Sequence, residues 1–196
     1  IDIILGGHTH DVLPKPVIVT NSTSKTLVIN SGCNGKFISI LDLNVNKNGF
    51  EYKYKLLPIL SDFIKPSSVM TTHINDVSRP YRKELSEVIG KSNMDLYRRG
   101  TFTGSFDQLI CESMVNVLGS DISLSPGFRW GPTIATNQPI TMGDIYDHTA
   151  ITYPNTYTRY MTGETIKNIL EDVADNLFNK DPYLQQGGDM VRTKGI

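Results

Sequence analysis

The spacing of hydrophobic residues changes near Ser61, and this change limits the chain to a fold with two unlike parts. Before Ser61, short apolar and β-branched runs alternate with turn residues, which is typical of β-strands. After it, hydrophobic residues recur at helical spacing, most clearly over residues 163–178. The pattern predicts a mixed α/β protein in which a strand-rich segment precedes a segment of helices and short strands.

The strand-rich segment contains five predicted strands, at residues 1–5, 16–21, 26–30, 37–45 and 50–57. Asn48-Gly49 separates the last two and is a strong signal for a tight hairpin turn. Apolar and charged residues alternate over residues 50–57, so one face of this hairpin is expected to pack and the other to meet solvent.

Helical patterns dominate the rest of the chain, where a mostly polar helix comes first and Pro80 must interrupt it. A capping-box spacing that starts at Ser105 and an apolar stripe that ends at Leu118 predict a second helix. The expected elements are a helix at 68–88, extended chain at 87–98, a helix at 105–118, a strand at 121–124, extended chain at 151–161 and a helix at 163–178. A polar helix between two apolar blocks suits a connector between domains. We therefore divide the chain into residues 1–62, a connector at 63–89 and a second domain at 90–196.

Composition excludes several classes of protein. The 196 residues carry a net charge of −1, with 39% hydrophobic and 20% charged residues, which is a globular composition without the basic excess of a broad nucleic-acid surface. No apolar run approaches the ~18 residues of a membrane span. Two cysteines, Cys33 and Cys111, are too few for a disulfide framework, and Cys111 is expected to pack inside a helix.

The chain begins at Ile1 without a methionine or a signal sequence and opens directly on an apolar strand. We therefore expect it to be an internal piece of a longer protein. Its start then says nothing about the compartment of that protein.

His8 and His10 are the first candidate site residues. They follow an apolar strand and Gly6-Gly7, so the loop can bring both imidazoles toward one ion, and neutral imidazole binds Mn, Fe and Zn. The alternative is a surface loop with two solvated histidines, but the strand and glycine context favours ligands. The remaining histidines, His73 and His148, are expected to be surface or hydrogen-bonded residues. Further ligands are expected from sequence before Ile1.

Arginines near Pro and Gly turns form a second candidate group. Arg129 follows a Pro-Gly turn, and an Arg fork on such a loop suits phosphate, sulfate or sulfonate. The alternative is that Arg129 stacks on Phe128 or Trp130. Arg98-Arg99 is a second basic pair, and the simplest interpretation from the residues alone is two solvated side chains.

Tyr153 and Asn155 form a third group together with the Gly-rich segment at 183–189. Aromatic and amide groups around such turns could line a recognition pocket or could be ordinary turns of an α+β domain. The residues alone leave both possibilities open.

Several long stretches resemble the 5′-nucleotidase family across essentially the whole chain. The GGHTHD loop is similar to the last metal-binding motif of the calcineurin-like metallophosphoesterases. The other stretches are YRRGTFTGSFDQLICESM, SPGFRWG, ITMGDIYDHTAITYPNT, MTGETIKNILEDVADNLFN and DPYLQQGGDMVR. Within the superfamily they are most similar to the SoxB family of dimanganese thiosulfohydrolases, the sulfate thiol esterases of bacterial thiosulfate oxidation. The resemblance implies that residues 1–62 end a metallophosphoesterase β-sandwich domain and that residues 90–196 are an incomplete 5′-nucleotidase-type C-terminal α+β domain.

The resemblance also implies roles for individual residues. His8 and His10 would each bind one of two manganese ions, with zinc or iron as possible substitutes. Arg99 and Arg129 would face the terminal sulfonate of the substrate, and Tyr153 and Asn155 would lie beside it. The family's other metal ligands and its catalytic His–Asp pair belong to motifs that this chain lacks, so no catalytic residue is expected in it.

The implied substrate is a cysteine S-thiosulfonate on the C-terminal arm of the SoxYZ carrier protein, and the implied compartment is the periplasm. Neither nucleic acid nor membrane is an expected partner. One alternative is a periplasmic 5′-nucleotidase or related phosphoesterase. The other is a fragment that only binds the carrier and has no activity, since most of the metal site is missing.

Overall fold

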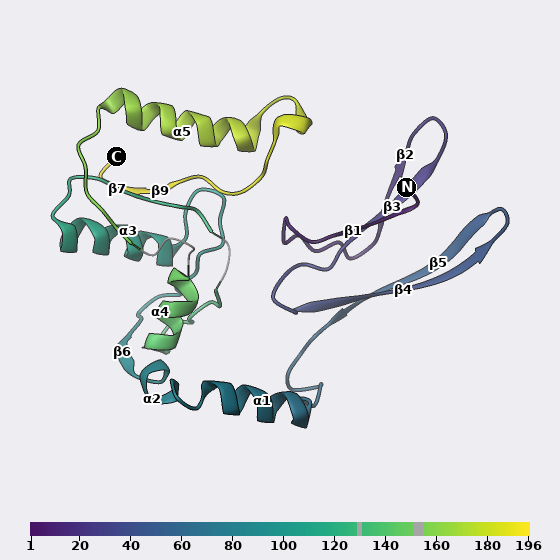
Figure 1. The fold of residues 1–196 in the computed structure, drawn as a ribbon, viewed down its shortest axis with the longest axis horizontal. Coiled ribbons are helices and arrows are strands. Elements are labelled where there is room, and N and C mark those ends of the chain that lie inside the picture. The colour runs from purple at the N-terminus through teal and green to yellow at the C-terminus, as the bar shows by residue number, and fades with distance from the viewer. Residues whose placement is uncertain (129–130, 151–154) are drawn as a thin grey trace. The chain divides into compact units, whose positions relative to one another are not determined.

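The computed structural model describes residues 1–128, 131–150 and 155–196 (Figure 1). Its contacts divide the chain into two compact units, Ile1–Asn75 and Asp76–Ile196. The division falls inside helix α1 (Ser68–Ser78), within the range 63–89 that the sequence assigns to a connector. The finer domain boundaries stay a prediction.

The first unit contains a three-stranded sheet of β1 (Ile3–Gly6), β2 (Val17–Thr20) and β3 (Lys25–Asn30). The order is β1-β3-β2, with β1 parallel and β2 antiparallel to the central strand. Because β3 is central, its Leu27 and Ile29 are buried. All three strands confirm the sequence prediction.

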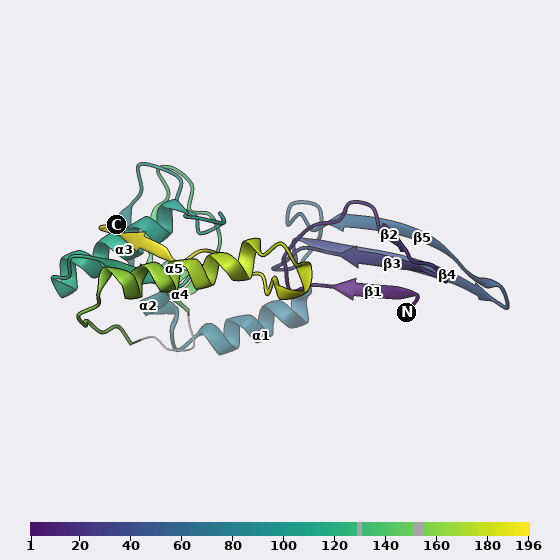
Figure 2. The same ribbon diagram turned by 90° about the horizontal axis from the view of Figure 1, so that it is seen from above.

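The same unit contains a long hairpin of β4 (Phe37–Asn46) and β5 (Gly49–Pro58), which turns at Asn48-Gly49 as predicted. Figure 2 shows it running beside the three-stranded sheet. Two polar contacts join them: Ser31 Oγ donates to Ser39 Oγ at 2.6 Å, and the Tyr54 hydroxyl donates to the Leu13 carbonyl at 2.9 Å. The hairpin therefore belongs to the same unit as the loops that follow β1.

Proline ends the connector helix as expected. Helix α1 stops two residues before Pro80, and a short helix α2 (Arg82–Leu85) follows. No residue of α1 is buried, which agrees with its polar sequence.

The second unit is an α+β domain with two small antiparallel sheets. Strand β6 (Val88–Lys91) pairs with β8 (Pro139–Thr141), and β7 (Ser123–Ser125) pairs with β9 (Arg192–Lys194). Its helices are α3 (Ser105–Leu118), α4 (Met142–Thr149), α5 (Gly163–Phe178) and the 3₁₀ turn η1 (Pro182–Leu184). The core consists of Leu96, Phe106 and Ile134, with Ile110, Ile140 and Ile145 packed against them.

Several predictions for this unit need correction. The sequence analysis missed β8, α4 and β9. Of the segment expected to be extended at 151–161, residues 151–154 lie outside the described residues, and residues 155–161 form neither helix nor strand. Ser105 does not cap α3: the N-cap is Gly104, whose N–H donates to the Asp107 carboxylate at 2.9 Å. The mixed α/β class is confirmed, and α5 has the predicted bounds. No helix in the described parts of the chain is long and apolar enough to cross a membrane.

Candidate functional site

The predicted metal-binding histidines lie on the loop that leaves β1. His10 has a left-handed backbone, with φ of 62°, and its N–H donates to the Gly7 carbonyl at 3.2 Å. Asn30 Nδ2 donates to Thr9 Oγ1 at 3.1 Å, which ties the loop to the end of the neighbouring parallel strand. The structure therefore holds His8 and His10 where the carboxyl ends of β1 and β3 meet, with His8 exposed and His10 half-buried.

These two imidazoles fit a metal site only as part of a larger ligand set. Two neutral imidazoles are suitable donors for Mn, Fe or Zn. Among the residues that the structure describes, no group of three or more His, Cys, Asp or Glu side chains could hold a metal ion. His73 lies exposed on α1, as expected of a surface residue.

The predicted substrate-binding residues belong to the second unit. Arg99 is exposed on the loop before α3, and Asn155 is exposed in irregular chain. Arg129 and Tyr153 lie outside the described residues. Their grouping around a substrate stays a prediction.

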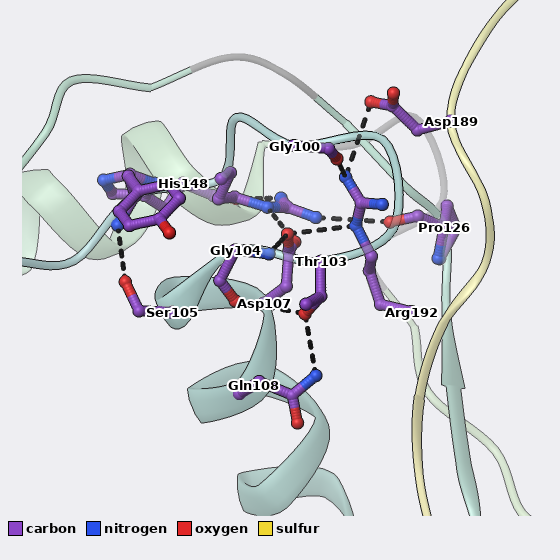
Figure 3. A network of polar contacts seen from close by, with 12 residues as sticks. Gly100, Thr103, Gly104, Ser105, Asp107, Gln108, Pro126, His148, Asp189 and Arg192 are labelled. Carbon is purple, nitrogen blue, oxygen red and sulfur yellow. Dashed lines mark hydrogen bonds and ion pairs between the residues drawn. The ribbon is translucent and has the colours of Figure 1, made fainter. Parts of the chain in front are cut away.

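The structure shows a buried charged network that the sequence analysis missed (Figure 3). Arg98 Nε donates to Asp107 Oδ1 at 2.8 Å, and Arg192 Nε donates to Asp107 Oδ2 at 3.0 Å. The side chains of Asp107 and Arg192 are fully buried and that of Arg98 is 2% exposed. The expectation that Arg98 is solvated is therefore wrong, because Asp107 and nearby carbonyls replace the water around its guanidinium.

Backbone carbonyls satisfy the remaining donors of the two arginines. Arg192 donates to the Gly100, Thr101 and Met190 carbonyls, at 2.6, 2.8 and 3.2 Å. Arg98 donates to the carbonyls of His148 and Pro126. Asp189 lies 3.5 Å from Arg192, so two carboxylates face two guanidinium groups and the buried charges balance. The network joins the start of α3 to the segments around residues 126, 148 and 190.

Phe128 contacts Arg98, whereas the sequence analysis had considered Arg129 as its partner. The Arg98 guanidinium lies over its ring, 5.5 Å from the centroid. Arg98 thus contacts both the Phe128 ring and the Pro126 carbonyl.

His148 is not a surface residue, and neither of its ring nitrogens has a hydrogen-bond partner among the residues that the structure describes, which corrects the expectation for it. It lies near the end of α4, is fully buried and stacks on Phe106, with ring centroids 3.9 Å apart. Burial lowers the pKa of its imidazole, and the nearby Arg98 cation lowers it further. The Thr141-x-x-Asp144 capping box was the sequence signal for α4 and for the position of His148 on it.

Cys111 is a packing residue, as predicted. It is fully buried in α3, and burial raises the pKa of its thiol. A neutral buried thiol is a poor nucleophile.

Comparison with known proteins connects these features to a family. The sequence profile described as "5'-nucleotidase, C-terminal domain" matches residues 86–193. A curated relative from Glossina morsitans morsitans, a "5'-nucleotidase-related protein", is 27% identical over 96% of this chain and 39% of its own length.

Two solved structures share the fold over both units. The sulfate thiohydrolase SoxB of Thermus thermophilus, solved with glycerol, is 34% identical with a TM-score of 0.92, over 100% of this chain and 36% of that one. A 5′-nucleotidase precursor, also of Thermus thermophilus, is 20% identical with a TM-score of 0.80, over 99% of this chain and 41% of that one. The chain therefore spans well under half the length of the relatives that it matches.

Proposed function

The chain belongs to the 5′-nucleotidase family, and from that premise we propose that it forms part of a metal-dependent hydrolase that releases sulfate from a cysteine S-thiosulfonate on a carrier protein. The observation that carries the proposal is the 34% identity to SoxB, which extends over the whole chain. The 5′-nucleotidase precursor shares the fold at 20% identity and supports the architecture alone. The proposed carrier is SoxYZ, through its cysteine-bearing arm, and the proposed compartment is the periplasm.

We propose that His8 and His10 each contribute one ligand to a pair of manganese ions, for which zinc or iron could substitute. The further ligands would come from residues that this sequence does not supply, since the described residues offer no larger cluster. When bound, two such ions lower the pKa of a water and supply hydroxide near neutral pH. The loop that positions both imidazoles is fixed by the hydrogen bond between Thr9 and Asn30.

The reaction needs groups that hold an anion while an S–S bond breaks. An oxygen from water adds to the terminal sulfur, sulfate leaves and the second sulfur stays on the carrier cysteine. Arg99 and Arg129 are the proposed contacts of the sulfonate oxygens, and Tyr153 and Asn155 the proposed walls beside them. Neither cysteine of this chain takes part, and Cys111 is too deeply buried to reach a substrate.

The second candidate function is hydrolysis of a nucleotide or another phosphoester. The family profile and the Glossina relative favour it, because both are described by nucleotidase activity. A third possibility is a chain that only binds the carrier.

The test is carried out on the intact enzyme that contains this chain. Sulfate release from SoxYZ that carries the cysteine S-thiosulfonate and phosphate release from AMP are measured in parallel, and we expect turnover of the carrier. Turnover of AMP alone rejects the proposal in favour of the nucleotidase, and binding of the carrier without turnover of either substrate favours the third possibility.

The metal ligands are tested in the same protein. We expect His8→Ala and His10→Ala to lower the manganese content and abolish sulfate release. His73→Ala is the matched control, because His73 is exposed on α1, and it should keep both. Full metal content in His8→Ala and His10→Ala rules out their role as ligands.

A further inference from the structure

His10 has an unusual backbone conformation for a residue with a side chain. Its φ of 62° lies in the left-handed region, which glycine adopts readily and other residues keep only where the surrounding structure holds them. The His10 N–H donates to the Gly7 carbonyl at 3.2 Å, so His8 and Thr9 occupy the middle of a tight turn. The histidine loop (residues 7–13) therefore depends on contacts with other parts of its unit.

Asn30, the last residue of β3, holds the histidine loop at two points. Its side-chain Nδ2 donates to Thr9 Oγ1 at 3.1 Å, and its main-chain carbonyl accepts the Leu13 N–H at 3.0 Å. Its Oδ1 accepts the Gly32 N–H at 3.3 Å, which orients the side chain. Asn30 is only 8% exposed, so water competes little for its amide. One residue thus fixes both the turn between the two histidines and the chain that follows His10.

A chain of hydroxyl groups holds the same loop from the β4–β5 hairpin. Tyr54 on β5 donates its hydroxyl proton to the Leu13 carbonyl at 2.9 Å. Ser39 Oγ on β4 lies 2.9 Å from the Tyr54 hydroxyl oxygen, and Ser31 Oγ donates to Ser39 Oγ at 2.6 Å. Because a tyrosine hydroxyl has a single proton, Ser39 must donate to Tyr54, and the bonds run in one direction toward Leu13. Both backbone groups of Leu13 are therefore bonded to residues outside the loop.

Close packing adds a further constraint at the end of the histidine loop. Val12 forms an isolated antiparallel bridge with Ser31. A Cβ at Gly32 would lie 2.7 Å from Val12 Cγ2, and the φ of 76° at Gly32 favours glycine. The loop therefore lies directly against the chain that follows β3.

We propose that Asn30 and Tyr54 are positioning residues for the metal site. Through Thr9 and Leu13 they hold the histidine loop in one conformation, so that its two imidazoles are prearranged before a metal ion binds. The proposal rests on the proposed function, in which both histidines bind metal. Neither Asn30 nor Tyr54 acts as a ligand itself. Prearranged ligands bind more tightly, because less conformational freedom is lost on binding.

The alternative is that these bonds only join the hairpin to the three-stranded sheet. Their loss would then lower the stability of the unit without a separate effect on metal binding. Tyr52 provides the comparison, because it lies two residues before Tyr54 on the same face of β5 and is 38% exposed. Removal of its hydroxyl is expected to leave the histidine loop in place.

The test measures manganese binding to the intact enzyme that contains this chain. Metal-free enzyme is titrated with Mn²⁺, and the unbound ion is quantified by electron paramagnetic resonance. We expect Tyr54→Phe and Thr9→Val to raise the Kd about tenfold, as is typical when groups that orient metal ligands are lost. Thr9→Ser keeps the hydroxyl that Asn30 binds and should recover most of the affinity lost in Thr9→Val. Tyr52→Phe is the matched control and should keep the Kd of the parent enzyme.

Two further measurements separate positioning from stability. The Kd values are compared at a temperature at which thermal unfolding shows each variant to be folded, so a loss of stability alone leaves the Kd unchanged. Thr9 is exposed, so Thr9→Val keeps the test available where Tyr54→Phe fails to fold. Amide hydrogen exchange of the metal-free enzyme should be faster across residues 7–13 in Tyr54→Phe than in Tyr52→Phe, because the loop opens more often.

The outcomes distinguish this proposal from the proposed function. A raised Kd in Tyr54→Phe and Thr9→Val, with recovery in Thr9→Ser, supports positioning. A Kd that is unchanged in both variants, or that rises equally in Tyr52→Phe, overturns it. Absence of sulfate release from an unmodified enzyme that binds manganese overturns the proposed function alone, because the Kd comparison still decides the role of Tyr54. An unmodified enzyme that binds no manganese overturns both.

Discussion

The carboxylate of Asp107 on α3 accepts a hydrogen bond from Nε of Arg192 on β9 at 3.0 Å, although 85 positions separate the two residues in the sequence. Both side chains are fully buried. Because the other carboxylate oxygen accepts Arg98, Asp107 compensates two guanidinium groups at once. Asp107 therefore joins α3 both to β9 and to the loop that precedes the helix.

Loss of the Asp107 carboxylate should strongly destabilise the second unit. Asp107→Ala leaves two buried arginines without their shared partner, and we expect the free energy of unfolding to fall by about 3–5 kcal/mol. Denaturant unfolding, followed by circular dichroism, measures the change.

The matched control is Glu112→Ala. Glu112 on α3 pairs with Lys194 on β9 at 3.4 Å, so the same two elements are joined, but these side chains are 54% and 46% exposed. An exposed pair contributes about 1 kcal/mol or less. Equal losses in the two variants would contradict the assignment of stability to burial of the network.

Acid should destabilise the fold through His148. Burial holds the pKa of its imidazole below the usual value of 6.5, so the unfolded chain binds a proton that the folded chain refuses. The free energy of unfolding should therefore fall as the pH drops below about 6.5, with a slope of at most about 1.4 kcal/mol per pH unit. His148→Gln should flatten this part of the stability curve. A variant curve parallel to that of the parent protein would show that His148 does not titrate in this way.

A methyl group at Gly104 should be poorly tolerated. A Cβ there would collide with the Tyr97 carbonyl and lie 2.9 Å from Arg98 Cα, so Gly104→Ala should cost about 1–3 kcal/mol of stability. Gly163→Ala is the control, because nothing lies within 4 Å of a Cβ at this first residue of α5. It should be neutral or stabilising by up to about 1 kcal/mol. Thermal unfolding of both variants compares them, and a stable Gly104→Ala would contradict the close packing.

Loss of the N-cap of α4 should lower the stability of the protein more than loss of a hydroxyl in the last turn of this helix. Thr141 Oγ1 accepts the Asp144 N–H at 3.2 Å, and Asp144 Oδ2 accepts the Thr141 N–H at 2.7 Å. Thr141→Ala should cost about 1 kcal/mol and speed amide exchange at the start of the helix. Thr149→Ala removes only a hydroxyl that donates to the Ile145 carbonyl, and it should cost less. The reverse order of effects would argue against the cap.

Local signals were sufficient for the elements that depend on local contacts. The β4–β5 turn forms at Asn48-Gly49 because that pair favours the required backbone, and α5 has its predicted bounds because its apolar residues share one face. The glycine loop after β1 was found for the same reason, since its strand and glycines are adjacent in the chain.

Other features depend on distant partners and have no local signal. Residues Arg192–Lys194 contain no apolar pattern and form β9 only because they pair with β7, some seventy positions earlier. Arg98 stands beside Arg99 in a segment typical of solvent, and it is buried because Asp107, Pro126 and His148 supply acceptors. The grouping of Arg129 and Tyr153 with Asn155 has no test in the described residues.

The pairing of β7 with β9 and of Asp107 with Arg192 also sets an order of events during synthesis on the ribosome. Domains fold as the chain emerges from its N-terminus, at about 5–20 residues per second. The β4–β5 hairpin joins neighbouring residues, so it can form early, whereas α3 must wait for some eighty further residues before its carboxylate meets the second guanidinium. A nascent chain in that interval has the Asp107 carboxylate without its Arg192 partner, so the buried network is incomplete until β9 has been made.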